Sequence, residues 1–152
     1  MRQKKTTTLA DFYMQAGLYT HAEALYIECL QIREKILGKE HPSTLISINN
    51  LAHLYESQGK YDQAEPLYVE CHEISVKVLG QHHLSTLTSI NNLAGLYKSQ
   101  GKYEQAEPLY MECLQLEEKI FGRHHPSTLI SINNLADLYE SQGKYDQAEP
   151  LY

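Results

Sequence analysis

The stretch SINNLAHLYESQGKYDQAEPLY occupies residues 47–68 and returns at residues 131–152, where the one change places Asp137 at the position of His53. The same 42-residue offset aligns residues 41–82 with residues 83–124, which are identical at most positions. Residues 125–152 repeat the first two thirds of this unit, and residues 1–40 hold a divergent, N-terminally incomplete copy. Repeats of this length are typical of solenoids, in which each unit packs mainly on its neighbours. We therefore predict a single solenoid over residues 1–152.

Each repeat carries two apolar stripes at helical spacing. The first contains Ile48, Leu51 and Tyr55, and it is followed by Gly59, which suits a left-handed helix stop. The second runs over residues 64–78 and is followed by Gly80. Because the turn between the two stripes is short, the two helices must pack antiparallel. The pattern predicts an all-α protein with seven to eight helices and no sheet.

The string NNLAHLYESQGKYDQAEPLY (residues 49–68) resembles a tetratricopeptide repeat, and the likeness recurs in every unit. The usual period of that family is about 34 residues, whereas the period here is 42. This long variety, with REKILGKEHPSTLISINNLA (residues 33–52) across the repeat junction, is similar to the repeats of kinesin light chains. The resemblance implies a right-handed α-solenoid whose first helices line a concave, peptide-binding groove.

Composition and charge limit the kinds of partner. The formal net charge is −6, and the basic cluster of Arg2, Lys4 and Lys5 is not followed by an apolar stretch. Nucleic-acid and anionic-membrane surfaces favour clustered Lys and Arg, so we expect neither partner and place the protein in the cytoplasm. The three cysteines recur at one repeat position and form no zinc-type pair; they are Cys29, Cys71 and Cys113. We interpret them as buried packing residues.

Three chemical interpretations of the repeated residues compete with structural ones. The twelve tyrosines recur at three positions of each repeat, which could form a stacking platform but better fits packing between helices. The pairs His82–His83 and His124–His125 could bind zinc, which needs four converging ligands. A catalytic set is asymmetric, whereas this chain nearly repeats itself. We therefore expect no enzyme activity, no metal and no cofactor.

The face of each first helix opposite its packing stripe is the candidate binding site. Paired asparagines recur on it, and an amide side chain offers a donor and an acceptor to the backbone of an extended peptide. In the tetratricopeptide family, matching asparagines hold the main chain of the ligand, and the resemblance implies the same here. The alternative is that they bond neighbouring helices and only stiffen the stack. The candidate residues are Ile46, Asn49, Asn50, His53 and Glu56, then Thr88, Asn91, Asn92 and Lys98, and finally Ile130, Asn133, Asn134, Asp137 and Glu140.

Differences between the repeated first helices fall on this candidate face, at the positions of residues 46, 53 and 56. Such changes are consistent with tuned recognition and equally with drift at exposed positions. Kinesin light chains bind acidic peptides through a basic groove. Here Asp11, Glu56, Asp137 and Glu140 stand against Lys98, so the groove is mildly acidic. We predict a neutral or basic partner segment.

The two ends of the chain interrupt the repeat. Tyr152 lies early in a second helix, and residues 1–8 replace most of a first helix, which leaves Tyr26 short of cover. We expect a fragment of a longer array. The alternative is a structural array that assembles with copies of itself by stacking its uncapped ends.

Overall fold

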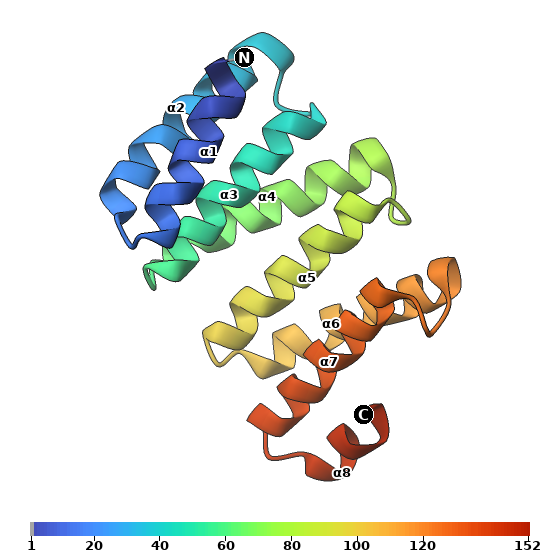
Figure 1. The fold of residues 1–152 in the computed structure, drawn as a ribbon. Coiled ribbons are helices and arrows are strands. Elements are labelled where there is room, and N and C mark those ends of the chain that lie inside the picture. Colours follow the sequence, from blue (N-terminus) through green and yellow to red (C-terminus); the bar gives the residue numbers. More distant parts are fainter. Residues whose placement is uncertain (1) are drawn as a thin grey trace. The chain divides into compact units, whose positions relative to one another are not determined.

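The computed structural model describes the backbone of residues 2–152 and the side chains from residue 6 onward. All of its regular structure in that range is helical, as predicted (Figure 1). The chain divides into two compact units, Met1–Val78 and Leu79–Tyr152. The first contains α1 (Arg2–Gln15), α2 (Tyr19–Leu37), α3 (Pro42–Ser57) and α4 (Tyr61–Leu79, whose last residue falls in the second unit). The second contains α5 (Leu84–Ser99), α6 (Tyr103–Phe121), α7 (Pro126–Ser141), α8 (Tyr145–Ala148) and the 3₁₀-helix η1 (Glu149–Leu151).

Three-residue turns join the two helices of each repeat. After α3, Gly59 adopts a φ of 71°, in the left-handed region that glycine enters without steric cost. The Gly59 and Lys60 amides donate to the carbonyls of Glu56 (2.9 Å) and Tyr55 (2.8 Å), which is a Schellman stop. The same bonds recur after α5 and α7. The predicted short turns and antiparallel helix pairs are therefore confirmed.

The repeat-junction histidines begin the first helices. His41 Nδ1 accepts a hydrogen bond from the Ser43 amide at 3.1 Å, so the imidazole caps α3. His83 caps α5 and His125 caps α7 in the same way, with distances of 3.1 and 3.2 Å. Each of these rings therefore accepts a hydrogen bond from a helix amide that would otherwise lack a partner.

Buried side chains in each unit come from successive helices. In the first unit Ala10 of α1, Ala22 and Tyr26 of α2, and Leu51 and Leu54 of α3 form one cluster. In the second unit Ala94, Ala106, Tyr110, Leu135 and Leu138 form the corresponding cluster. Tyr26 of α2 and Tyr110 of α6 thus pack beside alanines and leucines of first helices. The interpretation of the repeated tyrosines as packing residues holds for Tyr26, Tyr68, Tyr110 and Tyr139, all of which are buried.

The N-terminal prediction was wrong. Residues 2–15 form a helix of 14 residues at the first-helix position, so residues 1–8 do not replace that helix. Tyr26 is only 3% exposed, which shows that its cover is present. The threonines at 6–8 made this helix hard to predict from the sequence, because threonine is a poor helix former. Packing of Ala10 against Ala22 and Tyr26 stabilises α1 where local helix propensity is weak.

Candidate functional site

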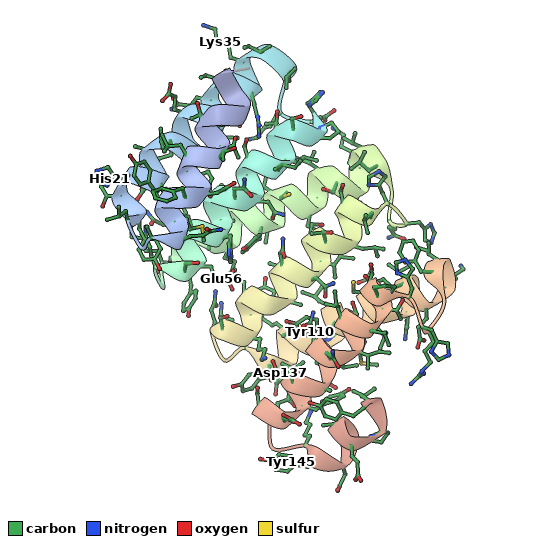
Figure 2. The ribbon with its side chains drawn as sticks, in the orientation of Figure 1. His21, Lys35, Glu56, Tyr110, Asp137 and Tyr145 are labelled. Atoms are coloured by element: carbon green, nitrogen blue, oxygen red, sulfur yellow. The ribbon has the colours of Figure 1, made fainter. Side chains whose placement is uncertain are left out.

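The candidate residues of the first helices are exposed or half-buried, whereas most of the packing stripe of the same helices is buried. On α3 and α7, Ile46 and Ile130 are 56% and 59% exposed, whereas Ile48 and Ile132 on the packing side are almost fully buried. The other exposed members of the set are His53, Thr88, Asn133, Asp137 and Glu140, and the half-buried ones are Asn49, Asn50, Glu56, Asn91, Asn92, Lys98 and Asn134. Figure 2 shows Glu56 on α3 in the first unit and Asp137 on α7 in the second.

The two asparagines of a pair occupy different environments. In the second unit Asn91 Nδ2 of α5 donates to Ser131 Oγ of α7 at 3.4 Å. The Oδ1 atoms of Asn49 and Asn91 are buried and have no hydrogen-bond partner within the described part of the chain. Asn91 therefore bonds the neighbouring first helix of its unit, as the stiffening alternative proposed.

The second asparagine faces a hollow in the first unit. Asn50 and His53 of α3 border a space of about 400 Å³ that Asp11 and Met14 of α1 close on one side. Tyr19 and Tyr26 of α2 complete the wall. This is the position expected of an amide that contacts a ligand. Asn50 thus borders an open space in its unit, whereas Asn91 bonds a neighbouring helix in the other unit.

Sequence reasoning missed the hydroxyl partners of the second-helix tyrosines. Tyr26 donates to Asp11 Oδ1 at 2.5 Å, and Tyr68 donates to Glu56 Oε2 at 2.9 Å. In the second unit Tyr152 donates to Glu140 Oε1 at 2.9 Å. The spacing of 12 residues shared by the last two pairs was a usable signal. The variable positions on the candidate face are therefore also bonding partners of buried or terminal tyrosines.

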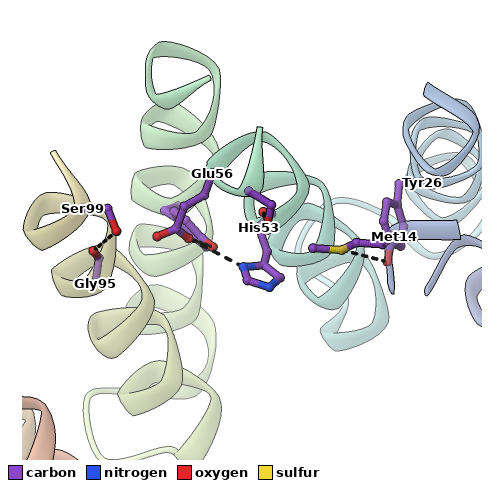
Figure 3. Close-up of polar contacts among 8 residues, drawn as sticks. Met14, Tyr26, His53, Glu56, Gly95 and Ser99 are labelled. Carbon is purple, nitrogen blue, oxygen red and sulfur yellow. Dashed lines mark hydrogen bonds and ion pairs between the residues drawn. The ribbon is translucent and has the colours of Figure 1, made fainter. Parts of the chain in front are cut away.

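Charges on the candidate face are partly paired within each unit. His53 Nδ1 lies 3.7 Å from Glu56 Oε2, and this contact raises the pKa of His53 despite the opposing effect of burial (Figure 3). Figure 3 also shows Met14 of α1 against the Tyr26 hydroxyl, at an S–O distance of 3.8 Å. In the second unit Lys98 of α5 forms an ion pair with Asp137 of α7. Four acids and one lysine still leave the face mildly acidic.

Neither the thiols nor the histidines form a reactive centre. Burial raises the pKa of Cys71 to about 11 and that of Cys113 to about 12, so both thiols stay protonated near neutrality. Cys71 Sγ lies 3.6 Å from the Leu45 carbonyl oxygen, and Cys113 Sγ lies 3.6 Å from that of Leu87. The prediction of buried packing cysteines is confirmed. Among the described side chains, no group of three His, Cys, Asp or Glu residues gathers as a metal site.

Antiparallel helix pairs joined by glycine-stopped turns define a helical-repeat protein. A tetratricopeptide repeat family model matches residues 4–75, 46–119 and 85–152. The chain therefore belongs to the tetratricopeptide repeat family, and the predicted α-solenoid class is confirmed. No helix among the described residues has both the length and the apolar character to cross a membrane.

Solved structures show the long-repeat type. A putative kinesin light chain from Podosopora anserina with nearly identical TPR-like repeats matches with a TM-score of 0.87 and 32% identity, over 99% of this chain and 71% of that one. A variant of that same protein gives the same values. BtubC (BKLC) from P. vanneervenii matches with a TM-score of 0.85 and 24% identity, over 98% of this chain and 59% of that one. No curated protein sequence matches the chain. The predicted kinesin-light-chain-like repeat is confirmed.

Proposed function

We propose that this chain is a non-enzymatic, cytoplasmic interaction module that binds an extended segment of a partner protein along the candidate face. The observation that carries the proposal is the position of Asn50 on α3, half-buried at the edge of an open hollow. Asn92 and Asn134 occupy the same repeat position and are also half-buried. Amides at this depth supply donors and acceptors to a peptide backbone whatever its side chains.

The test compares two triple variants that remove amides from equivalent repeat positions. Asn50, Asn92 and Asn134 are replaced by Ala in the first variant. In the matched control the exposed second-helix residues Gln63, Gln105 and Gln147 are replaced by Ala. The probe is the strongest binder that the wild-type chain selects from a random peptide library. Calorimetry should show a loss of about 0.5–1.5 kcal/mol for each asparagine, the usual value of a neutral hydrogen bond.

Two outcomes would contradict the proposal. One is an asparagine variant that folds normally and binds the selected peptide as well as the wild type does. The other is failure to select any peptide, combined with light scattering that grows with protein concentration in the absence of ligand. The second outcome would favour the self-assembling array instead.

A further inference from the structure

The hollow beside α1, α2 and α3 combines a negative charge with aromatic and amide groups. Asp11 is exposed on α1, and the buried Tyr26 donates to one of its two carboxylate oxygens. Burial, followed by the bond to Asp11, raises the pKa of Tyr26 far above its usual value, so the phenol stays neutral. The carboxyl group of Asp11 is therefore the acidic group of the hollow, beside a neutral phenol. Within the described residues, no lysine or arginine forms an ion pair with Asp11.

In the second unit, a lysine occupies one of the repeat positions that border the hollow in the first unit. The position of Met14 is taken by Lys98, and the position of His53 is taken by Asp137. Lys98 and Asp137 form an ion pair between α5 and α7, and the lysine side chain is only 24% exposed. An ion pair from within the chain thus bridges these two successive first helices. In the first unit Met14 brings no charge, and the space of about 400 Å³ remains open.

We propose that the open hollow binds an arginine side chain of the partner segment, with Asp11 as its counter-ion. This inference rests on the proposed function, because it names the side chain that the candidate face receives. A guanidinium carries five donors in a plane and binds a carboxylate through two parallel hydrogen bonds. Asp11 offers the carboxylate, Asn50 an amide oxygen, and Tyr19 a half-buried ring against which the plane can stack.

The probe for this site is N-acetyl-arginine amide, titrated into the ¹⁵N-labelled chain and followed by NMR. Its neutral counterpart is N-acetyl-citrulline amide, which has nearly the same shape without the charge. We expect the arginine compound to shift the amide signals of residues around Asp11, Asn50 and His53, and the citrulline compound to bind about tenfold more weakly. One charge-assisted hydrogen bond is worth a difference of this size.

Three variants separate the charge of Asp11 from general effects. Asp11→Asn keeps an acceptor for the Tyr26 hydroxyl but removes the charge, so it should weaken arginine binding about tenfold. Met14→Lys places an internal cation at the repeat position of Lys98 and should block the site while retaining Asp11. Glu73→Gln removes one exposed charge from α4, outside the hollow, and should leave binding unchanged.

The outcomes distinguish this inference from the proposed function. Equal binding of arginine and citrulline compounds, or arginine binding that survives both Asp11→Asn and Met14→Lys, would overturn the arginine site. So would tighter binding of N-acetyl-lysine amide, the amine counterpart, because the guanidinium geometry would then be irrelevant. If the arginine compound binds as expected but no library peptide is selected, the site stands and the peptide-binding function fails. If selected peptides bind without any arginine preference, the function stands and the site fails.

Discussion

At the scale of single residues, the histidine that precedes each first helix has a defined structural task. His125 Nδ1 accepts from the Ser127 amide at 3.2 Å, and its ring stacks on Phe121 with a centroid separation of 4.6 Å. The neighbouring His124 is exposed. The two adjacent histidines, which the sequence alone could have assigned to a metal site, therefore differ completely in environment.

Replacing His125 with Ala should destabilise the second unit by about 1 kcal/mol, because α7 loses its N-terminal cap. His124→Ala is the matched control and should change the free energy of unfolding by less than about 0.5 kcal/mol, as exposed substitutions usually do. Urea unfolding followed by circular dichroism measures both. Equal effects of the two substitutions would show that the capping bond contributes nothing.

Glu117 is the most unusual buried residue of the second unit. It lies on α6, is 3% exposed, and its Oε2 atom has no hydrogen-bond partner among the described residues. Burial raises the pKa of Glu117, while a hydrogen bond with Ser131 and the nearby His125 act in the opposite direction. The same repeat position holds Arg33 in the first unit, which donates to Ser47 Oγ at 2.7 Å. Ionised Glu117 is thus a cost to folding.

Glu117→Gln should therefore stabilise the protein, by on the order of 1 kcal/mol at neutral pH. The folded-state pKa is raised, so the folded chain binds the proton more tightly than the unfolded chain does, and stability falls as pH rises through that range. The gain from the substitution should be largest above the raised pKa of Glu117 and should disappear toward pH ~4, near the ordinary pKa of Glu.

Thermal unfolding at several pH values checks this prediction. The exposed Glu112, also on α6, supplies the control Glu112→Gln, which should show little change. If the Glu117→Gln variant is less stable than the wild type at neutral pH, the carboxylate is stabilised by its surroundings and the prediction is wrong.

At the scale of the helices, prolines occupy two kinds of position. Pro126 is the first residue of α7, where the missing amide hydrogen has no helical partner to lose. Pro108 lies inside α6, which nevertheless continues from Tyr103 to Phe121. A proline there leaves the carbonyl four residues earlier without its helical donor and strains the preceding turn. Local propensity thus opposes α6, and packing on α5 and α7 maintains it.

Pro108→Ala should stabilise the second unit by about 1–3 kcal/mol, because it restores the amide donor and relieves the strain. Pro126→Ala makes the same chemical change at the start of α7. It should be neutral or slightly destabilising, because it increases the conformational entropy of the unfolded chain. The urea midpoint should therefore rise for Pro108→Ala and not for Pro126→Ala. A loss of stability in Pro108→Ala would show that the proline ring has a packing role outweighing the helix strain.

At the scale of the whole molecule, charge is the property most relevant to binding. The net charge is −6, and the candidate face carries more acids than bases. Some of these acids are bonded inside each unit, as Glu56 is to Tyr68 and Asp137 is to Lys98. Hydrogen bonding to a tyrosine does not neutralise a carboxylate, so a negative potential remains over the face.

Library peptides that carry basic residues should therefore bind better than acidic ones of the same length. The advantage should shrink as salt is added, because exposed charges are screened beyond about 8 Å at physiological ionic strength and over shorter distances at higher salt. Fluorescence anisotropy at several salt concentrations measures this. If acidic peptides bind best and salt removes their preference, the candidate face does not have the negative potential proposed here.

Much of the fold was determined by the sequence alone, since repeated apolar stripes set which side of each helix is buried. Ile48 and Leu51 are buried and Ile46 is exposed, as the 3.6-residue period requires. Gly59 marks a turn because few other residues tolerate its positive φ. These features depend on interactions within one helix or turn, so they can be predicted from neighbouring residues. The first helix was not predicted, because the threonines at 6–8 weaken the helix propensity of that segment.

Tertiary structure decided how the candidate face is used. Adjacent residues Asn49 and Asn50 have the same side chain, yet Asn49 turns a buried oxygen toward the packed side and Asn50 borders the hollow. Likewise the equivalent positions of Met14 and Lys98 give an open space in one unit and an ion pair in the other. A period fixes the direction of a side chain around its own helix, but not the group it meets on the next one. That group depends on how successive helices cross, which only packing in three dimensions sets.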